Sequence, residues 1–138
     1  MRIYFSGSIR GVKADIKTYR AIVNQLKEYG TVLTEHVAEA DESDENKIDD
    51  REIFKQDLEW LKSTDVLVAE VTAPSHGVGY EIGKAEEYRI PVLCLYNEAT
   101  GRQLSAMING NDYLTVKRYR TVQDAVKIIK EYFTGVST

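Results

Sequence analysis

The chain has one cysteine and only two histidines among its 138 residues. Cys94 therefore has no partner within the chain for a disulfide bond, which is usual in reducing compartments, and we expect a cytoplasmic location. His36 and His76 lie far from Cys94 and from each other in the sequence. Because zinc sites draw on closely spaced cysteine and histidine ligands, we expect no bound metal.

The chain also lacks a basic region and a long apolar run. Its net charge is −4 and no stripe of lysine and arginine stands out, so nucleic acid is not an expected partner. An anionic ligand should therefore be small and bound locally. No apolar run is long enough to span a membrane, and Met1 leads directly into a predicted strand, so we expect neither a membrane partner nor a signal peptide.

Short apolar runs alternate with amphipathic helical patterns along the chain. Apolar residues make up 43% of the sequence, and the length suits a single domain spanning residues 1–138. The predicted strands comprise residues 2–5, 31–36, 65–71, 90–96 and 113–119. The predicted helices comprise residues 14–29, 51–63, 79–89 and 102–108 and a last helix capped by Thr121. This alternation predicts an α/β fold, a Rossmann-like or flavodoxin-like three-layer sandwich with a five-stranded parallel sheet.

Three segments carry more specific expectations. Four apolar residues of the helix at 51–63 recur at helical spacing and are expected to face the core, namely Ile53, Phe54, Leu58 and Leu61. Thr121 and Asp124 are spaced as the N-cap and third helical position of the last helix. The acidic segment 37–50 has few large apolar residues, which indicates a solvated surface loop.

Polar and glycine-rich segments follow four of the predicted strands. They are SGSIRG after the first strand, Glu35 and His36 after the second, EVTAPSHGVGYE after the third and YNEATGRQLS after the fourth. Because ligands of parallel α/β sheets bind at the carboxyl ends of the strands, these segments are expected to meet at one edge. Loops are generally polar, but the placement of the glycines is not explained in that way. We therefore predict a ligand site at this edge.

The segment SGSIRG has two interpretations from its residues alone. Backbone N–H groups just before a helix bind phosphate, and Gly7 and Gly11 permit close approach to the backbone. The hydroxyls of Ser6 and Ser8 add donors, and Arg10 adds a guanidinium suited to phosphate. A capped turn into the helix explains the same residues equally well. The P-loop and dinucleotide fingerprints are both absent.

Glu81 is the first candidate for chemistry at this edge. It is expected in the first turn of a helix, where the helix dipole and free N–H groups stabilise a carboxylate anion. An ionised carboxylate in a cleft can act as a nucleophile. Glutamate is also simply favoured in first turns for its charge. Gly77, Gly79 and Gly83 favour a site, because they indicate that something packs close to the backbone here.

Asp57 is the second candidate. It lies four residues from both Ile53 and Leu61, so it shares their helix face. Burial there would raise the pKa of Asp57, which suits a proton donor, but the side chain could equally turn out to solvent or cap a loop. Tyr4 could direct its phenol to the same edge or pack in the core, and we expect His36 to be a loop histidine rather than a base.

Two carboxyl groups without a metal site favour glycosidic chemistry. In such reactions one carboxylate attacks the anomeric carbon through an oxocarbenium-like transition state, while an acid assists the leaving group. A retaining mechanism places the two carboxyl groups about 5–5.5 Å apart.

Several motifs occur together in an order that resembles one known family. They are YFSGSIRG, GTVLTEHVA, QDLEWLKSTDVLVAEVTAPSHGVGYEIGKA and GRQLSAMI, and they extend from Tyr4 to Ile108. In this order they resemble the 2'-deoxynucleoside 5'-phosphate N-hydrolases of the nucleoside 2-deoxyribosyltransferase superfamily. The resemblance implies cleavage of deoxynucleoside monophosphates to a free base and 2-deoxyribose 5-phosphate, with no cofactor and no metal.

The resemblance also implies roles for individual residues. Glu81 would be the nucleophile that forms a deoxyribosyl ester, Tyr4 would position it, and Asp57 would contact the sugar and transfer protons. The residues expected to bind substrate, largely through its 5'-phosphate, are Ser8, Ile9, Arg10, Gly11, His36, Ser75, Gly77, Gly79, Ser105 and Met107. The family's sites are completed across a homodimer, so Ser105 would come from the partner subunit.

Three further functions are compatible with these residues. The first is that of a nucleoside 2-deoxyribosyltransferase, which would use Glu81 in the same way but would pass the sugar to a second base. Those transferases typically carry an acid six positions before the nucleophile, where this chain has Ser75, which tolerates a phosphate. The second is hydrolysis of ribonucleotides such as CMP, and the third is nucleotide binding without catalysis on the same fold.

Overall fold

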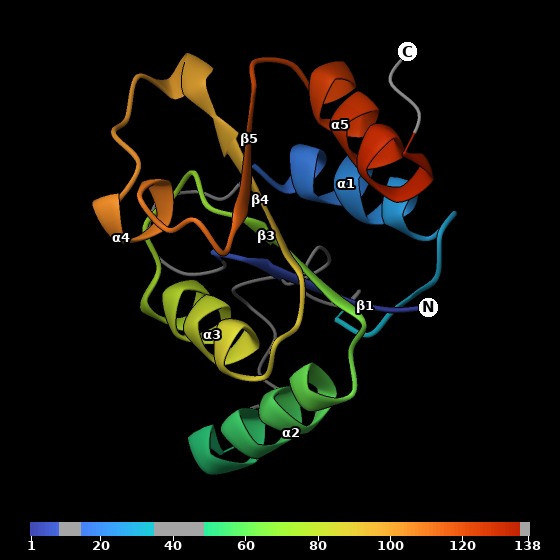
Figure 1. Cartoon of the computed structure of the whole chain (residues 1–138), viewed down its shortest axis with the longest axis vertical. Helices are drawn as coiled ribbons and strands as arrows, with labels where there is room; N and C mark the ends of the chain where they lie inside the picture. Colours follow the sequence, from blue (N-terminus) through green and yellow to red (C-terminus); the bar gives the residue numbers. More distant parts are fainter. Residues whose placement is uncertain (9–14, 35–48, 136–138) are drawn as a thin grey trace.

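The computed structural model describes residues 1–8, 15–34 and 49–135. The helices and strands (Figure 1) are β1 (Arg2–Gly7), α1 (Ile16–Leu26), β2 (Thr31–Val32), α2 (Asp50–Lys62), β3 (Val66–Glu70), α3 (His76–Glu87), β4 (Val92–Asn97), the 3₁₀ turn η2 (Glu98–Thr100), α4 (Ala106–Asn109), β5 (Thr115–Tyr119) and α5 (Val122–Thr134).

The strands form one parallel sheet of five strands in the order β2-β1-β3-β4-β5. This confirms the predicted fold class, and the order is the flavodoxin-like one. Strand order reverses between β1 and β3, which pair from Ile3 with Val66 to Gly7 with Glu70. A crevice for a ligand is expected outside the carboxyl ends of these two strands.

Helices cover both faces of the sheet. Alternation along β1 sends Ile3 and Phe5 into one core cluster, with side chains of α1 and α5, and sends Tyr4 into the other, with side chains of α3. Figure 1 shows α1 and α5 together on one side of the sheet and α2 and α3 on the other. The strand β3 lies in the middle and is buried along its whole length.

A buried carboxyl group ends this central strand. Glu70 is only 3% exposed and accepts hydrogen bonds from the backbone N–H (2.7 Å) and the hydroxyl (2.9 Å) of Thr72. The hydroxyl of Tyr119 at the end of β5 also donates to Glu70, and the N–H of Asn97 at the end of β4 donates to the Thr72 hydroxyl (2.8 Å). A buried carboxyl group requires such hydrogen-bond partners. These bonds join the carboxyl ends of three strands.

The expectation for α2 was wrong in its first half. Leu61 is buried, but Ile53 is 37% exposed and Phe54 is 52% exposed. Helical spacing predicts which residues share one face of a helix. It does not predict how much of that face the rest of the protein covers. Here the C-terminal end of α2 meets the core, and the face beyond it borders a cavity.

Other boundaries also differ from the predictions. α3 begins at His76 instead of 79, α4 is a single turn from Ala106, and β2 is only two residues long. Thr34, expected in that strand, lies in a turn, where its hydroxyl accepts a hydrogen bond from the N–H of Phe5 at 2.8 Å. Most of the acidic segment lies outside the described residues.

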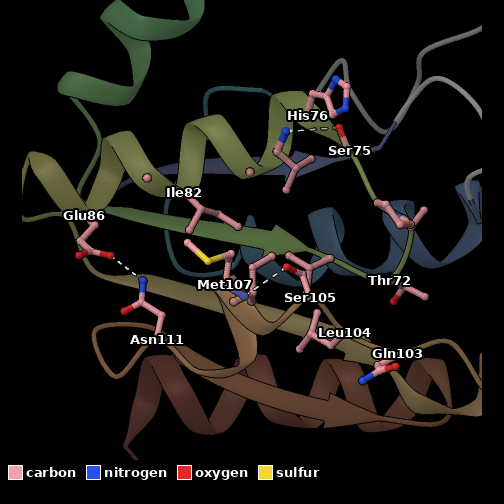
Figure 2. A pocket seen from close by; sticks show the side chains of 17 residues that line it. Thr72, Ser75, His76, Ile82, Glu86, Gln103, Leu104, Ser105, Met107 and Asn111 are labelled. Atoms are coloured by element: carbon pink, nitrogen blue, oxygen red, sulfur yellow. Dashed lines mark hydrogen bonds between the residues drawn. The ribbon is translucent and has the colours of Figure 1, made fainter.

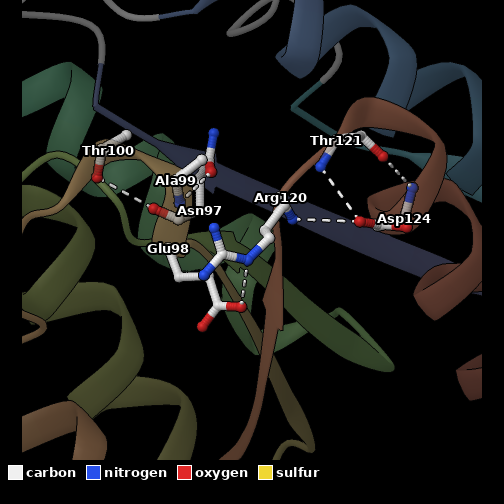
Figure 3. Close-up of polar contacts among 7 residues, drawn as sticks. All are labelled: Asn97, Glu98, Ala99, Thr100, Arg120, Thr121 and Asp124. Carbon is white, nitrogen blue, oxygen red and sulfur yellow. Dashed lines mark hydrogen bonds and ion pairs between the residues drawn. The ribbon is translucent and has the colours of Figure 1, made fainter.

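The predicted cap of α5 is confirmed (Figure 3). The Thr121 hydroxyl accepts a hydrogen bond from the N–H of Asp124, and the Asp124 carboxylate accepts one from the N–H of Thr121. Next to it, Arg120 forms an ion pair with Glu98 at 3.2 Å, with side chains that are 67% and 37% exposed.

Replacing Thr121 by alanine should lower the free energy of unfolding by about 0.5–2 kcal/mol, because the first turn of α5 loses its side-chain acceptor. The neighbouring variant Arg120→Ala should cost less than about 1 kcal/mol, because an exposed ion pair is screened by water. Urea unfolding curves of both variants measure this difference. A larger loss in the Arg120 variant would show that the ion pair and not the cap secures the start of α5.

Candidate active site

A cavity of about 460 Å³ opens at the carboxyl end of β1 and the start of α3, on the edge of the sheet where the topology places a ligand crevice. Its lining comes from β1, the turn after β2, α2 and the first half of α3, and consists of Tyr4, Phe5, Ser6, Gly7, Thr34, Asp57, Ser75, His76, Gly77, Val78 and Glu81. The fold thus brings together the three predicted catalytic residues with two of the predicted substrate-binding residues.

Glu81 is held by two hydroxyl groups of strand β1. The Ser6 hydroxyl donates a hydrogen bond to Oε1 of Glu81 at 3.1 Å, and the Tyr4 hydroxyl donates a second one to the carboxyl group. Tyr4 and Ser6 are two positions apart on the strand, so both point to the face covered by α3. Sequence reasoning assigned Ser6 only to the loop, although this spacing shows that it shares the face of Tyr4.

The predicted stabilisation of Glu81 by its helix was wrong. α3 begins at His76 after its N-cap Ser75, so Glu81 lies in the second turn, beyond the N–H groups that lack helical partners. Burial raises the pKa of Glu81 to about 7, the hydrogen bonds from Tyr4 and Ser6 oppose this rise, and the charge of Asp57 adds to it. Near neutral pH the carboxyl group therefore exists in both protonation states.

Tyr4 serves both the core and the cavity. Its side chain is 2% exposed and belongs to the core cluster on the α3 face, and it also lines the cavity. Burial and the neighbouring charge of Glu81 raise the pKa of the Tyr4 phenol. The charge of Asp57 raises this pKa further. The phenol thus stays protonated and can donate its hydrogen bond to Glu81 across the pH range in which enzymes work.

Asp57 faces the cavity from α2. Its side chain is half-buried, it lines the cavity with Glu81, and its charge acts on both Glu81 and Tyr4. Of the two orientations left open by the sequence, the structure supports the inward one. Two carboxyl groups and a phenol are therefore electrostatically coupled within one crevice.

The loop after β1 is described only at its start. Gly7 lines the cavity, and a Cβ atom on it would lie 2.8 Å from the ring of Tyr19, so this position needs a glycine for space. Ser8 is buried and its carbonyl accepts a hydrogen bond from the Tyr19 hydroxyl at 3.2 Å. Four predicted binding residues lie outside the described residues, namely Ile9, Arg10, Gly11 and His36.

Gly79, Ser105 and Met107 do not line this cavity. They line a second cavity of about 590 Å³ between α3 and α4 (Figure 2), together with Glu86 and Asn111, whose side chains are joined by a hydrogen bond of 2.7 Å. Three residues border both cavities, namely Ser75, His76 and Val78. Within one chain, Ser105 and Met107 are thus separated from Glu81 by the start of α3.

Across residues 1–8, 15–34 and 49–135 no group of three or more histidine, cysteine, aspartate or glutamate residues could hold a metal ion. Within the same part of the chain, no helix combines the length and apolar character needed to cross a membrane.

Solved structures with the same fold include a CMP N-glycosidase and a 2-deoxyribosyltransferase. A CMP N-glycosidase from Clostridium botulinum matches with a TM-score of 0.67 at 16% identity, over 96% of this chain and 99% of that one. A 2-deoxyribosyltransferase from Leishmania mexicana matches with a TM-score of 0.51 at 16% identity, over 88% and 81% of the two chains. At such low identity these likenesses show the fold alone.

Sequence comparison gives a closer relationship. The 5-hydroxymethyl-dUMP N-hydrolase of Esox lucius is 44% identical over 144 residues, which cover 99% of both chains. The human 5-hydroxymethyl-dUMP N-hydrolase is 53% identical over 111 residues, which cover 78% of this chain and 64% of the human one. The family model described as nucleoside 2-deoxyribosyltransferase matches residues 3–118, which include the whole crevice as the structure describes it. The chain therefore belongs to the nucleoside 2-deoxyribosyltransferase family.

Proposed function

We propose that this protein is an N-glycosidase that hydrolyses 2'-deoxynucleoside 5'-monophosphates to a free base and 2-deoxyribose 5-phosphate. The observation that carries the proposal is the half-buried Glu81 carboxyl group, held by Tyr4 and Ser6 and facing a crevice that it shares with Asp57. Relatives at 44% and 53% identity bear the name of a hydrolase that acts on one such nucleotide, which supports the same class of substrate for this chain.

In the proposed reaction, ionised Glu81 attacks C1' of the sugar as the bond from C1' to the base nitrogen breaks. The base leaves with the electron pair of that bond and takes up a proton, and Asp57 is placed to supply it. Water then gives a proton to the Asp57 carboxylate as its oxygen attacks C1' of the ester. This step releases 2-deoxyribose 5-phosphate and restores both the Glu81 carboxylate and the protonated Asp57. The hydrogen bonds from Tyr4 and Ser6 favour the ionised form and orient it.

The 5'-phosphate is proposed to bind at the polar end of the crevice. Ser75 caps α3 there, with its hydroxyl 3.3 Å from the N–H of Val78, and the start of a helix favours an anion. The loop from Ser8 to Gly11, with Arg10, would supply the remaining contacts. A serine at position 75 leaves this end free of the negative charge that an acid would bring close to a phosphate.

We further propose that two copies form a homodimer through α3 and α4. Met107 is 84% exposed at the edge of the 590 Å³ cavity, and nothing lies within 4 Å of a Cβ atom placed on Gly79 or Gly83. A partner's helix can therefore pack closely on this face and bring its Ser105 to the adjoining crevice.

The single, buried Cys94 fits a reducing compartment, and we propose a cytoplasmic location.

Replacing Glu81 by glutamine should abolish base release, because an amide cannot form the ester with C1', while the nucleotide still binds. Chromatography of products and calorimetric titration with dUMP measure the two properties. Glu87→Gln, an exposed neighbour on the same helix, is the control and should keep full activity. Turnover at the parent rate in the Glu81 variant would refute the nucleophile assignment.

The rate should depend on the ionisation of Glu81. Because this carboxyl group has a pKa of about 7 and reacts when ionised, kcat/KM should rise as the pH increases through about 7. Ser6→Ala removes a hydrogen bond that lowers the pKa of Glu81, so the rise should move to higher pH. Tyr4→Phe should move it in the same direction. A profile that stays in place in both variants would assign the titrating group elsewhere.

Gly83→Glu should convert the dimer into monomers, because the new charge would lie in the α3 face that the partner covers. Glutamate has a higher helix propensity than glycine, so the fold itself should persist. Sedimentation velocity measures the mass, and Gly83→Ala, which adds one methyl group, serves as the control. If the parent protein sediments as a monomer at micromolar concentration, the dimer proposal is wrong.

A further inference from the structure

The strand β1 leads into the loop proposed to bind phosphate, and it contacts helices on both faces of the sheet. On one face its side chains hold Glu81, as described above. On the other face Phe5 and Gly7 lie against Tyr19 of α1. Because successive residues of a strand point to opposite faces, the start of the loop can be held from the α1 face without a contact to Glu81.

Tyr19 fills the space against this end of β1. Its side chain is 3% exposed, and its ring meets that of Phe5 edge to face, with centroids 5.4 Å apart and planes inclined by 73°. A Cβ atom on Gly7 would lie 2.8 Å from Cε2 and 2.9 Å from Cζ of the Tyr19 ring. The hydroxyl of the same ring donates a hydrogen bond to the carbonyl of Ser8 at 3.2 Å. One side chain thus packs against the end of the strand and fixes the direction of the next carbonyl group.

Tyr19 also holds the described residue at the other end of this segment. Asp15 is the N-cap of α1, and its carboxylate accepts hydrogen bonds from the N–H (3.2 Å) and the hydroxyl of Thr18. The Asp15 carbonyl accepts a hydrogen bond from the N–H of Tyr19 at 3.0 Å. Ser8 and Asp15 are the described residues on either side of positions 9–14. Tyr19 is therefore bonded to both, through its hydroxyl and through its backbone.

The Tyr19 hydroxyl is kept in its donor form. Burial raises the pKa of the phenol, and the charge of Glu70 at the end of β3 raises it further. The phenol is therefore protonated at neutral pH and donates to the Ser8 carbonyl, which can only accept. The direction of this hydrogen bond is thus fixed.

We propose that Tyr19 is a positioning residue for substrate binding, which turns the Ser8 carbonyl toward α1 and so orients the loop for the 5'-phosphate. The inference rests on the proposed function and adds to it a residue that does not line the crevice. A loop binds an anion through the N–H ends of its peptide groups, whereas the carbonyl ends repel it. A Ser8 carbonyl that is bonded to Tyr19 is directed away from a phosphate in the crevice.

Tyr19→Phe keeps the ring against Gly7 and removes the hydrogen bond to Ser8. Steady-state kinetics with dUMP, or with the deoxynucleoside monophosphate that the parent cleaves fastest, should show KM raised roughly three- to tenfold, as expected for one lost hydrogen bond. The value of kcat should stay within about twofold, because the contacts to Glu81 lie on the other face of the sheet. Inorganic phosphate, used as a competitive inhibitor, should show its Ki raised by the same factor as KM.

Tyr113→Phe is the matched control. The Tyr113 hydroxyl also donates to a backbone carbonyl, that of Ile90 at 2.7 Å, and Tyr113 does not line the crevice. This variant loses the same kind of hydrogen bond, so thermal unfolding of both variants measures the cost to the fold. Its KM and its Ki for phosphate should equal those of the parent.

Three results would overturn the positioning role. They are a fall in kcat of Tyr19→Phe with KM and Ki unchanged, parent values of all three constants in that variant, and an equal rise of KM and Ki in Tyr113→Phe. If inorganic phosphate does not compete with the substrate in the parent protein, the loop is no phosphate site and the role of Tyr19 is wrong as well. A parent protein that cleaves no deoxynucleoside monophosphate would instead overturn the proposed function.

Discussion

The contact between strand β1 and the Glu81 carboxyl group is the interaction on which the rest of the site depends. Tyr4 and Ser6 reach Glu81 because β1 pairs with β3 in a register that brings its carboxyl end beside the start of α3. The same two hydroxyl groups oppose the effect of burial on the carboxyl group. Without them, desolvation would raise the pKa of this carboxyl group further.

Much of the fold follows from the sequence, because the pattern of apolar residues and turns is local. Alternating strands and helices predicted the parallel sheet, as the structure confirms. The sequence left open whether Asp57 and Tyr4 face the ligand edge, and in the structure both line one cavity with Glu81. The prediction that Ile53 and Phe54 face the core was wrong. Helical spacing shows which residues share a face of the helix, but it does not show whether that face packs against the core. Apolar residues beside a cavity and apolar residues in a core have the same spacing.

The electrostatics of the site could not be predicted in the same way. The dipole of α3 was expected to keep Glu81 ionised, but the helix begins three residues before the predicted start at 79, and desolvation dominates. How strongly a group is desolvated depends on segments distant in sequence, here β1 and α2. The partnership of Ser6 with Glu81 is likewise set by strand pairing, although the two-residue spacing from Tyr4 offered a clue.

The hydrogen bonds around Glu70 give the last strand an importance beyond closing the sheet. Tyr119 belongs to the edge strand β5, yet its hydroxyl reaches past β4 to a carboxyl group on the central strand, which in turn fixes Thr72 at the start of the segment leading to Ser75. A chain shortened just before Tyr119 would keep the crevice residues but would leave the buried Glu70 carboxyl group without one of its donors. The far edge of the sheet is thus connected through Glu70 to the segment that leads into α3, and removing Tyr119 would loosen that connection.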